Sequence, residues 1–215
     1  MLWLSVAAHR FDRSVKLPSV ANSRQRIIDA TLTTLKEKGF AATSTRAIAA
    51  NGGFRAGLIF YYFPTLDDLL IAALEHASVE RLERYADDIA AASTLSELLS
   101  LLERIYADDR ASGFVRIVSE MVAGSVADPE LGPRMVALVE PWLDATEAAA
   151  ERVLAPTGLA RLVSPRQLAF AAVTFYLGAN LLTQLVPDSR EVEEILRTAR
   201  RMAPLLDAIA GAQDA

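Results

Sequence analysis

Helix start signals recur along this chain, and they constrain its fold more than any other feature. At five places, a short side chain that can accept a hydrogen bond is followed three residues later by an acid or an amide. Such a pair can form a capping box, which satisfies the free amides at the start of a helix. The pairs are Asn22–Gln25, Thr65–Asp68, Thr94–Glu97, Ser164–Gln167 and Asp188–Glu191. Asp128–Pro129 is a sixth signal, because proline is accepted at the first helical position.

Apolar residues between these signals recur every three or four positions, as in Ile28, Leu32 and Leu35, so they share one helix face. No stretch shows the sustained alternation of a strand. We therefore predict an all-α fold of about nine helices. Pro141 and Pro204 predict a kink or break inside two of them, because proline has no amide to donate. The expected helices span 23–38, 45–51, 55–62, 66–91, 95–109, 113–126, 130–154, 165–186 and 189–211.

Charge is distributed unevenly along the 215 residues, whose formal net charge is −5. Residues 1–65 contain nine Lys or Arg against three Asp or Glu, whereas residues 66–215 contain thirteen against twenty-four. The basic first part can bind a polyanion, which the acidic second part would repel. We therefore expect two parts with different partners.

The composition leaves little material for catalysis or metal binding. The chain has no cysteine and two histidines, His9 and His76, so thiolate metal sites, cysteine nucleophiles and disulfides are excluded. Adjacent acids such as Asp67–Asp68, Asp87–Asp88 and Asp108–Asp109 point about 100° apart on a helix and form no convergent dyad. We interpret them as solvated surface and helix caps. We predict that the protein is not an enzyme and that it has no metal and no cofactor.

Residues 167–186 carry no charge and are long enough to span a bilayer. The polar side chains of Gln167, Thr174, Asn180, Thr183 and Gln184 are costly in lipid without partners, so a helix buried in a core and a subunit interface fits better. A membrane-associated protein anchored here is an alternative, and it would sediment with membranes. The N-terminus lacks the pattern of a signal peptide, so we expect a loosely ordered extension over 1–21 and a cytoplasmic protein.

Residues 43–64 have the spacing of a helix-turn-helix. Ala49 is small enough for a second helix to cross closely, Gly53 can adopt the positive φ of a tight turn, and Ile59 can reach back into the same core. This pattern predicts a DNA-binding unit with residues 55–62 as the recognition helix.

The wider context resembles the tetracycline-repressor (TetR) family of bacterial regulators over about residues 23–70. The matching motifs, in order, are Arg26-Ile-Ile-Asp-Ala, Gly39-Phe, Thr45-Arg-Ala-Ile-Ala, Gly53-Phe, Gly57-Leu-Ile-Phe-Tyr-Tyr-Phe63 and Asp68-Leu-Leu70. The resemblance implies a helix-turn-helix DNA-binding domain over 22–65 and a ligand-binding and dimerisation domain over 66–215. It also implies a homodimer in which the last two long helices of each subunit form a four-helix interface.

The resemblance places the DNA contacts at the start of the second helix and along the recognition helix. Ile59 and Phe63 are expected in the core. Two residues depart from the family pattern: Phe60 stands where a tyrosine is usual, and Leu66 stands where a lysine is usual. Leu58 or Phe60 could contact a thymine methyl group, and Arg46 or Arg55 a guanine. The expected contact residues are Ser44, Thr45, Arg46, Arg55, Ala56, Gly57, Leu58, Phe60, Tyr61 and Tyr62.

For the second part of the chain, aromatic, soft and polar side chains on helical segments suggest an apolar pocket with a few polar groups. The pocket candidates are Tyr106, Phe114, Met121, Trp142, Phe170, Thr174 and Phe175. Each could instead be an ordinary core residue. Small residues permit close helix approach and favour a dimer interface on the 165–186 helix. The interface candidates are Gly178, Ala179, Asn180, Leu182 and Gln184.

Together these features predict a DNA-binding transcriptional regulator. We expect a dimeric repressor that binds an inverted repeat in double-stranded DNA and is released by a small, largely apolar effector. An alternative is a helical small-molecule-binding protein whose helix-turn-helix does not discriminate between DNA sequences, which the departures at Phe60 and Leu66 would favour.

Overall fold

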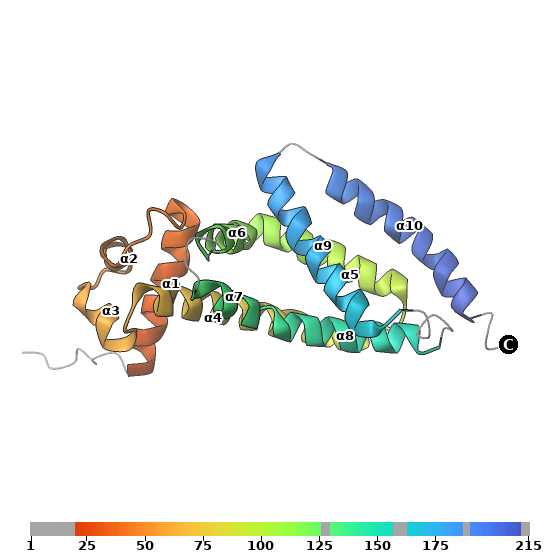
Figure 1. Ribbon diagram of the computed structural model, residues 1–215, viewed down its shortest axis with the longest axis horizontal. Helices are drawn as coiled ribbons and strands as arrows, with labels where there is room; N and C mark the ends of the chain where they lie inside the picture. Colours follow the sequence, from red (N-terminus) through yellow and green to blue (C-terminus); the bar gives the residue numbers. More distant parts are fainter. Residues whose placement is uncertain (1–19, 126–129, 157–162, 187–189, 212–215) are drawn as a thin grey trace, which may run out of the picture.

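The computed structural model describes residues 20–125, 130–156, 163–186 and 190–211, and over these ranges it contains ten α-helices and no strand. The all-α prediction is confirmed. Helices α2 and α3 lie at one end of an elongated molecule, and α10 runs to the other end (Figure 1). The helices are α1 (Val20–Lys38), α2 (Thr45–Gly52), α3 (Gly57–Tyr62), α4 (Leu66–Ala91), α5 (Leu95–Ser112), α6 (Phe114–Ser125), α7 (Leu131–Ala137), α8 (Glu140–Leu154), α9 (Pro165–Leu185) and α10 (Glu191–Gly211).

The predicted capping residues begin three of these helices. Thr65 and Thr94 each form both halves of a capping box, with Asp68 and Glu97 as partners. The hydroxyl of Ser164 accepts a hydrogen bond from the amide of Gln167 at 3.3 Å. The start predicted at Asn22 is wrong, because α1 already begins at Val20. The signals at 128–129 and 188 lie outside the described residues.

The two internal prolines behave differently. The predicted helix over 130–154 is broken before Pro141 into α7 and α8, which is why the structure has one helix more than expected. The chain turns there through hydrogen bonds between residues three positions apart, such as the one from the Val139 amide to the Val136 carbonyl at 2.9 Å. Pro204 does not interrupt α10. It is exposed, so water can bind the carbonyl that loses its amide partner.

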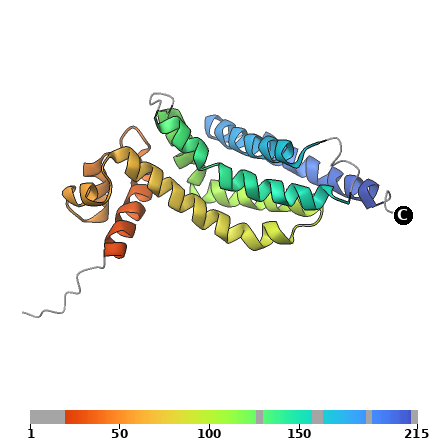
Figure 2. The same ribbon diagram turned by 60° about the horizontal axis from the view of Figure 1, so that its bottom comes forward.

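Two hydrophobic cores meet at the first turns of helix α4. The first core belongs to the head, which we define as α1, α2 and α3, and it joins these helices to the first turns of α4, where Leu69 and Ala73 are fully buried. The neighbouring Leu70 and Leu74 point instead into a second core, formed with α1, α6 and α7. Because successive residues of α4 serve different cores, this helix connects the end that holds α2 and α3 to the rest of the molecule (Figure 2).

One predicted surface residue is in fact buried. Asp109 is 1% exposed and forms an ion pair with Arg81 of α4, which is itself 6% exposed. Arg81 also lies over the Phe114 ring, with its guanidinium carbon 4.3 Å from the ring centroid. Burial raises the pKa of Asp109 to about 7. The surface interpretation of Asp109 is therefore wrong, because its neighbour in the fold lies 28 positions away in the sequence.

Helix α9 is long and apolar enough to cross a membrane, as judged by its length and composition only. Its inner side carries polar groups, and some of them bond within the chain, whereas the buried side-chain oxygen of Asn180 has no partner among the described residues. Thr183 and Tyr106 of α5 share a hydrogen bond between their hydroxyls at 2.7 Å. Its outer side is apolar and exposed, and so is part of α10. The exposed apolar residues of the two helices are Leu168, Phe170, Phe175, Leu177, Leu181, Leu182, Leu185, Ile195, Met202 and Leu205.

Candidate functional site

Helices α2 and α3 are joined by a tight turn that depends on one glycine. The hydroxyl of Ser44 caps α2 by accepting a hydrogen bond from the amide of Ala47 at 3.2 Å. The helix ends at Gly53, which has φ +66° and donates its amide to the carbonyl of Ala49. Only glycine adopts this left-handed conformation without steric cost. The role predicted for Gly53 is confirmed.

A second glycine is needed for a different reason, which the sequence did not show. A Cβ on Gly52 would lie 2.1 Å from the Phe54 ring and 2.9 Å from the Cβ of Ala30. The end of α2 therefore packs directly on α1. Arg26 of α1 donates a hydrogen bond to the Gly52 carbonyl at 3.3 Å and holds the same end. The motif gave no signal for this contact, because Ala30 lies outside it.

The core of the head is as predicted. Ile59 and Phe63 are 0% and 4% exposed, and they pack with Ile28 and Ile48. Leu66, which replaces the usual lysine, is half-buried against both cores. Its apolar side chain therefore has a packing role at the start of α4, while the cation that the family resemblance implies is absent.

The ten predicted DNA-contact residues fall into two groups by exposure. Exposed residues are Ser44, Arg46, Arg55, Gly57, Phe60 and Tyr61, whereas Thr45, Ala56, Leu58 and Tyr62 are partly buried. Arg46 and Arg55 form no ion pair with the residues that the structure describes, so both guanidinium groups are available to an anion. Arg46 lies in the first turn of α2 and Arg55 lies just before α3, so each of the two helices carries an unpaired positive charge at its start.

Two polar contacts, which the sequence did not indicate, join this head to the helices behind it. Arg134 of α7 donates a hydrogen bond to Asp68 at the start of α4, at 3.0 Å. Glu120 of α6 accepts one from the amide of Phe40 at 3.0 Å, and its carboxylate fills the space beside Gly39. These contacts hold the chain just before and just after the helix-turn-helix segment to α6 and α7. Both contacts join residues more than 60 positions apart.

The predicted pocket residues are not gathered around a single cavity. Met121 lies in the second core, Tyr106 is buried between α5, α9 and α10, and the Trp142 indole donates a hydrogen bond to Ser78. Phe114 borders a hollow between α1, α4 and the start of α6, with a volume of about 670 Å³. Phe170 borders another, of about 600 Å³, between α7, α8 and α9. Thr174 and Phe175 line neither hollow and are exposed on α9.

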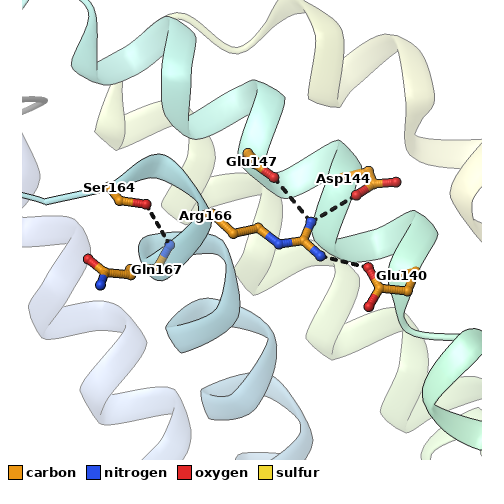
Figure 3. A network of polar contacts seen from close by, with 6 residues as sticks. All are labelled: Glu140, Asp144, Glu147, Ser164, Arg166 and Gln167. Carbon is orange, nitrogen blue, oxygen red and sulfur yellow. Dashed lines mark hydrogen bonds and ion pairs between the residues drawn. The ribbon is translucent and has the colours of Figure 1, made fainter. Parts of the chain in front are cut away.

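The hollow at Phe170 is apolar with a charged edge. Val136, Val139 and Leu143 line it together with Phe170. At the edge, Arg166 donates hydrogen bonds to three carboxylates on one face of α8, namely those of Glu140, Asp144 and Glu147, at 2.6, 2.8 and 3.1 Å (Figure 3). These bonds, led by the one to Glu140, raise the pKa of Arg166. The cluster has an excess of negative charge.

The predicted interface residues lie on different sides of α9. Leu182 is 61% exposed on the outer side, whereas Ala179 and Asn180 are buried on the inner side. The amide nitrogen of Asn180 donates to the Tyr176 carbonyl at 2.8 Å. Gln184 reaches α6, where it donates to the hydroxyl of Ser119 at 2.6 Å. Gly178 is half-buried, and a Cβ there would meet no atom within 4 Å.

A capped helix, a glycine turn and a second helix with an exposed face beside free arginines define a helix-turn-helix protein of the DNA-binding class. The profile of the family described as bacterial regulatory proteins, tetR family, matches residues 27–73. The regulator BetI of Cronobacter sakazakii is 30% identical over 145 residues, which cover 66% of this chain and 71% of BetI. The repressor KstR of Mycolicibacterium smegmatis is 28% identical over 132 residues, covering 50% of this chain and 64% of KstR.

A solved structure has the same fold with little sequence similarity. The regulator FadR from Bacillus subtilis, in complex with stearoyl-CoA, superposes with a TM-score of 0.68 at 17% identity, over 83% of this chain and 96% of FadR. The fold is therefore that of a solved transcriptional regulator. On the basis of the profile and the BetI match, the chain belongs to the tetR family of bacterial regulatory proteins. It is a DNA-binding transcriptional regulator and not an enzyme.

Proposed function

We propose that this protein is a cytoplasmic, homodimeric repressor that binds an inverted repeat in double-stranded DNA and is released by a small, largely apolar effector. The observation that carries the proposal is the exposed face of α2 and α3, with Arg46 and Arg55 unpaired beside it. The name of KstR, a repressor, supports the direction of regulation. Of the chain's predicted contacts, the six exposed ones are proposed to meet DNA directly.

The dimer is proposed to form through the outer sides of α9 and α10. Leu181, Leu182 and Leu185 of α9 are exposed, as are Met202 and Leu205 of α10. Contiguous apolar surface of this kind is a typical protein–protein interface, and its burial is favoured by about 25 cal/mol per Å². A second copy of the chain would also cover the side of α9 that otherwise resembles a membrane span. Leu182 is accordingly a contact across the interface, whereas Ala179 and Asn180 hold α9 in its own subunit.

A two-fold dimer sets the geometry of DNA binding. Each α3 would enter the major groove, and the two would be separated by about one helical turn of DNA, or about 34–36 Å. A half-site is therefore contacted by a single head, and the operator is expected to be symmetric. The spacing depends on the angle between the subunits. A change in the body, by which we mean the helices from α5 to α10, can therefore alter DNA affinity without a change in the head.

The proposed effector site is the hollow between α7, α8 and α9. Four apolar residues line it, and Arg166 with Glu140 provides polar groups at its edge, which is the pattern of a small-molecule site. The solved complex of FadR with stearoyl-CoA shows that one protein of this fold takes a ligand with a long apolar chain. Of the pocket candidates, Phe170 would contact the effector.

The position of this hollow allows a ligand to act on the head. Val136 and Val139 lie two and five residues after Arg134, which holds the start of α4 through Asp68. A ligand that binds more tightly when α7 is displaced would weaken the DNA-binding arrangement. It can shift the equilibrium only by its difference in affinity between the two arrangements.

The experiment is to select DNA fragments from the source genome with purified protein at about physiological salt, where non-specific binding is weak. Enrichment of one or a few inverted repeats is the expected result. An Arg46→Ala, Arg55→Ala double variant should recover no specific site while remaining folded and dimeric. Uniform recovery of fragments by the wild-type protein would contradict sequence-specific repression and support a head that binds DNA without reading sequence.

A further inference from the structure

The outward surface of α3 has few groups that form hydrogen bonds. Its exposed residues are Gly57, Phe60 and Tyr61, and solvent reaches 55% of Phe60 and 75% of Tyr61. Gly57 has no side chain, and a Cβ placed on it would meet no atom within 4 Å. The hydroxyl of Tyr61 is therefore the single polar side-chain group among these three residues. Base recognition by this surface has to use apolar contacts as well as hydrogen bonds.

Phe60 is the apolar side chain on this surface that the protein itself does not cover. Its neighbours Leu58 and Tyr62 pack against the head core, and Ile59 is part of that core. The Phe60 ring is not among the residues of either core that α4 shares. Contact with an apolar group on a partner would remove the ring from water, which is favourable in proportion to the area covered.

The major groove of DNA offers one apolar group at its base edges, which is the C5 methyl group of thymine. The other groups there are hydrogen-bond donors and acceptors, and a phenyl ring would cover them without satisfying them. Phe60 also lacks the hydroxyl of the tyrosine that is usual at this position in the family, so it cannot donate a hydrogen bond to a phosphate. Both facts favour thymine at the position that Phe60 meets.

We propose that Phe60 is a specificity-determining residue that recognises a thymine methyl group in each half-site of the operator. This inference rests on the proposed DNA-binding function and deepens it by naming the base and the group that is read. Gly57 contributes by leaving space for the α3 backbone to approach the groove closely. Arg46 and Arg55 supply affinity through charge, whereas Phe60 supplies discrimination.

The test uses the duplex that wild-type protein enriches most strongly from a random-sequence library. It is synthesised again with deoxyuridine replacing thymidine at one symmetric pair of positions at a time, which removes the methyl groups and keeps the base pairing. At the position read by Phe60, we expect affinity to fall about 4-fold per methyl group, as burial of one such group contributes about 0.8 kcal/mol. Replacement in both half-sites should lower the affinity about 15-fold, since the two half-sites are expected to contribute independently.

Variants connect this loss to Phe60. Phe60→Ala should bind the thymidine and deoxyuridine duplexes equally, whereas Phe60→Tyr, which keeps the ring, should retain the discrimination. Tyr61→Phe is the matched control, because it removes a hydroxyl from the adjacent exposed residue and should leave the methyl discrimination intact. Phe60 is exposed, so these variants should fold, and thermal unfolding verifies it.

A further substrate isolates the methyl group from the rest of the base. A pair of 5-methylcytosine and guanine places the methyl group at the same point of the groove but presents different hydrogen-bonding groups. Wild-type protein should prefer it over unmethylated cytosine, and Phe60→Ala should not. Equal binding of thymidine and deoxyuridine duplexes by wild-type protein overturns the proposal, and so does an equal loss in Phe60→Ala. Failure to enrich any duplex would instead refute the proposed function, and this inference with it.

Discussion

Arg134 of α7 and Asp68 of α4 are joined by a hydrogen bond of 3.0 Å from the guanidinium to one carboxylate oxygen. The other oxygen of Asp68 accepts hydrogen bonds from the amide and the hydroxyl of Thr65, at 3.2 and 2.8 Å. The residue that closes the capping box of α4 is therefore also the residue that α7 holds. Because α4 starts four residues after α3 ends, this contact links the body to the recognition helix.

Arg134→Gln should loosen the start of α4 without unfolding the protein. The pair is partly exposed, so its loss should lower the free energy of unfolding by less than about 1 kcal/mol. Hydrogen exchange should nevertheless speed up at the Asp68 amide, which the capping box holds. Arg104→Gln is the matched control, because it breaks an exposed ion pair with Asp88 away from the cap. Unchanged exchange at Asp68 would show that α7 does not hold the cap.

Arg46→Ala should weaken DNA binding through the loss of a phosphate contact. The slope of log affinity against log salt should fall by about one unit per head, hence about two per dimer, because each neutralised phosphate releases a counterion. Arg104→Ala removes the same charge from the body and should leave the slope unchanged. If Arg46→Ala instead relaxes the preference at one base pair while the slope stays the same, Arg46 contacts a base edge and not a phosphate.

Three glycines of the head should respond differently to alanine. Gly53→Ala would place an alanine in a left-handed conformation and should lower the free energy of unfolding by about 1–2 kcal/mol. Gly52→Ala should cost more, because its Cβ would overlap the Phe54 ring. At Gly57 a Cβ would meet no atom within 4 Å and φ is not positive, so Gly57→Ala should keep its stability. Its DNA affinity should fall if the α3 backbone approaches the groove closely. Chemical denaturation measures the first two effects, and titration of the selected duplex measures the third.

The contrast among these glycines also shows what the sequence could predict. The need for a glycine at position 53 follows from a local turn. The burial of Ile59 follows from its fixed offset within the helix-turn-helix. Both were therefore predictable. Gly52 has to be glycine partly because Ala30 of α1 lies close to it, and the Tyr106 hydroxyl is buried because it bonds to the Thr183 hydroxyl. Both contacts depend on how the helices cross. Helical periodicity identifies the apolar side of a helix but not the helix that covers it. The turn and the core positions of residues 43–64 were therefore predictable, whereas the contacts between helices, including that of Gly52 with α1, were not.

Leu182→Glu should convert the proposed dimer into a monomer. A carboxylate at this exposed position would have to be buried without a partner when a second copy covers α9. Sedimentation equilibrium should show the wild-type protein as a dimer and the variant as a folded monomer that binds the inverted repeat much more weakly. Val79→Glu, on an exposed apolar residue of α4, should remain dimeric. Recovery of the wild-type protein with membranes would contradict the dimer assignment.

Asp207 of α10 should make the stability of the protein depend on pH in the acidic range. Its carboxylate accepts hydrogen bonds from the amides of Leu95 and Ser96, at 3.0 and 3.2 Å, while the capping box of Thr94 and Glu97 satisfies the amides of those two residues. All four free amides at the start of α5 are thus satisfied, two of them from another helix. Replacement by alanine should cost about 1 kcal/mol, as is typical for loss of a cap.

The sign of the pH effect follows from the pKa of Asp207. Burial raises this pKa, but the hydrogen bonds from Ser96 and from the two amides outweigh burial, so the folded value lies below the ordinary one of 3.8. The stabilisation is therefore fully present above about pH 4 and is lost as the pH falls through the lower folded value. Denaturation at pH 7 and at pH 3 should show a smaller acid-induced loss of stability in Asp207→Asn than in the wild-type protein. An equal loss in both would mean that the carboxylate does not cap α5 in solution.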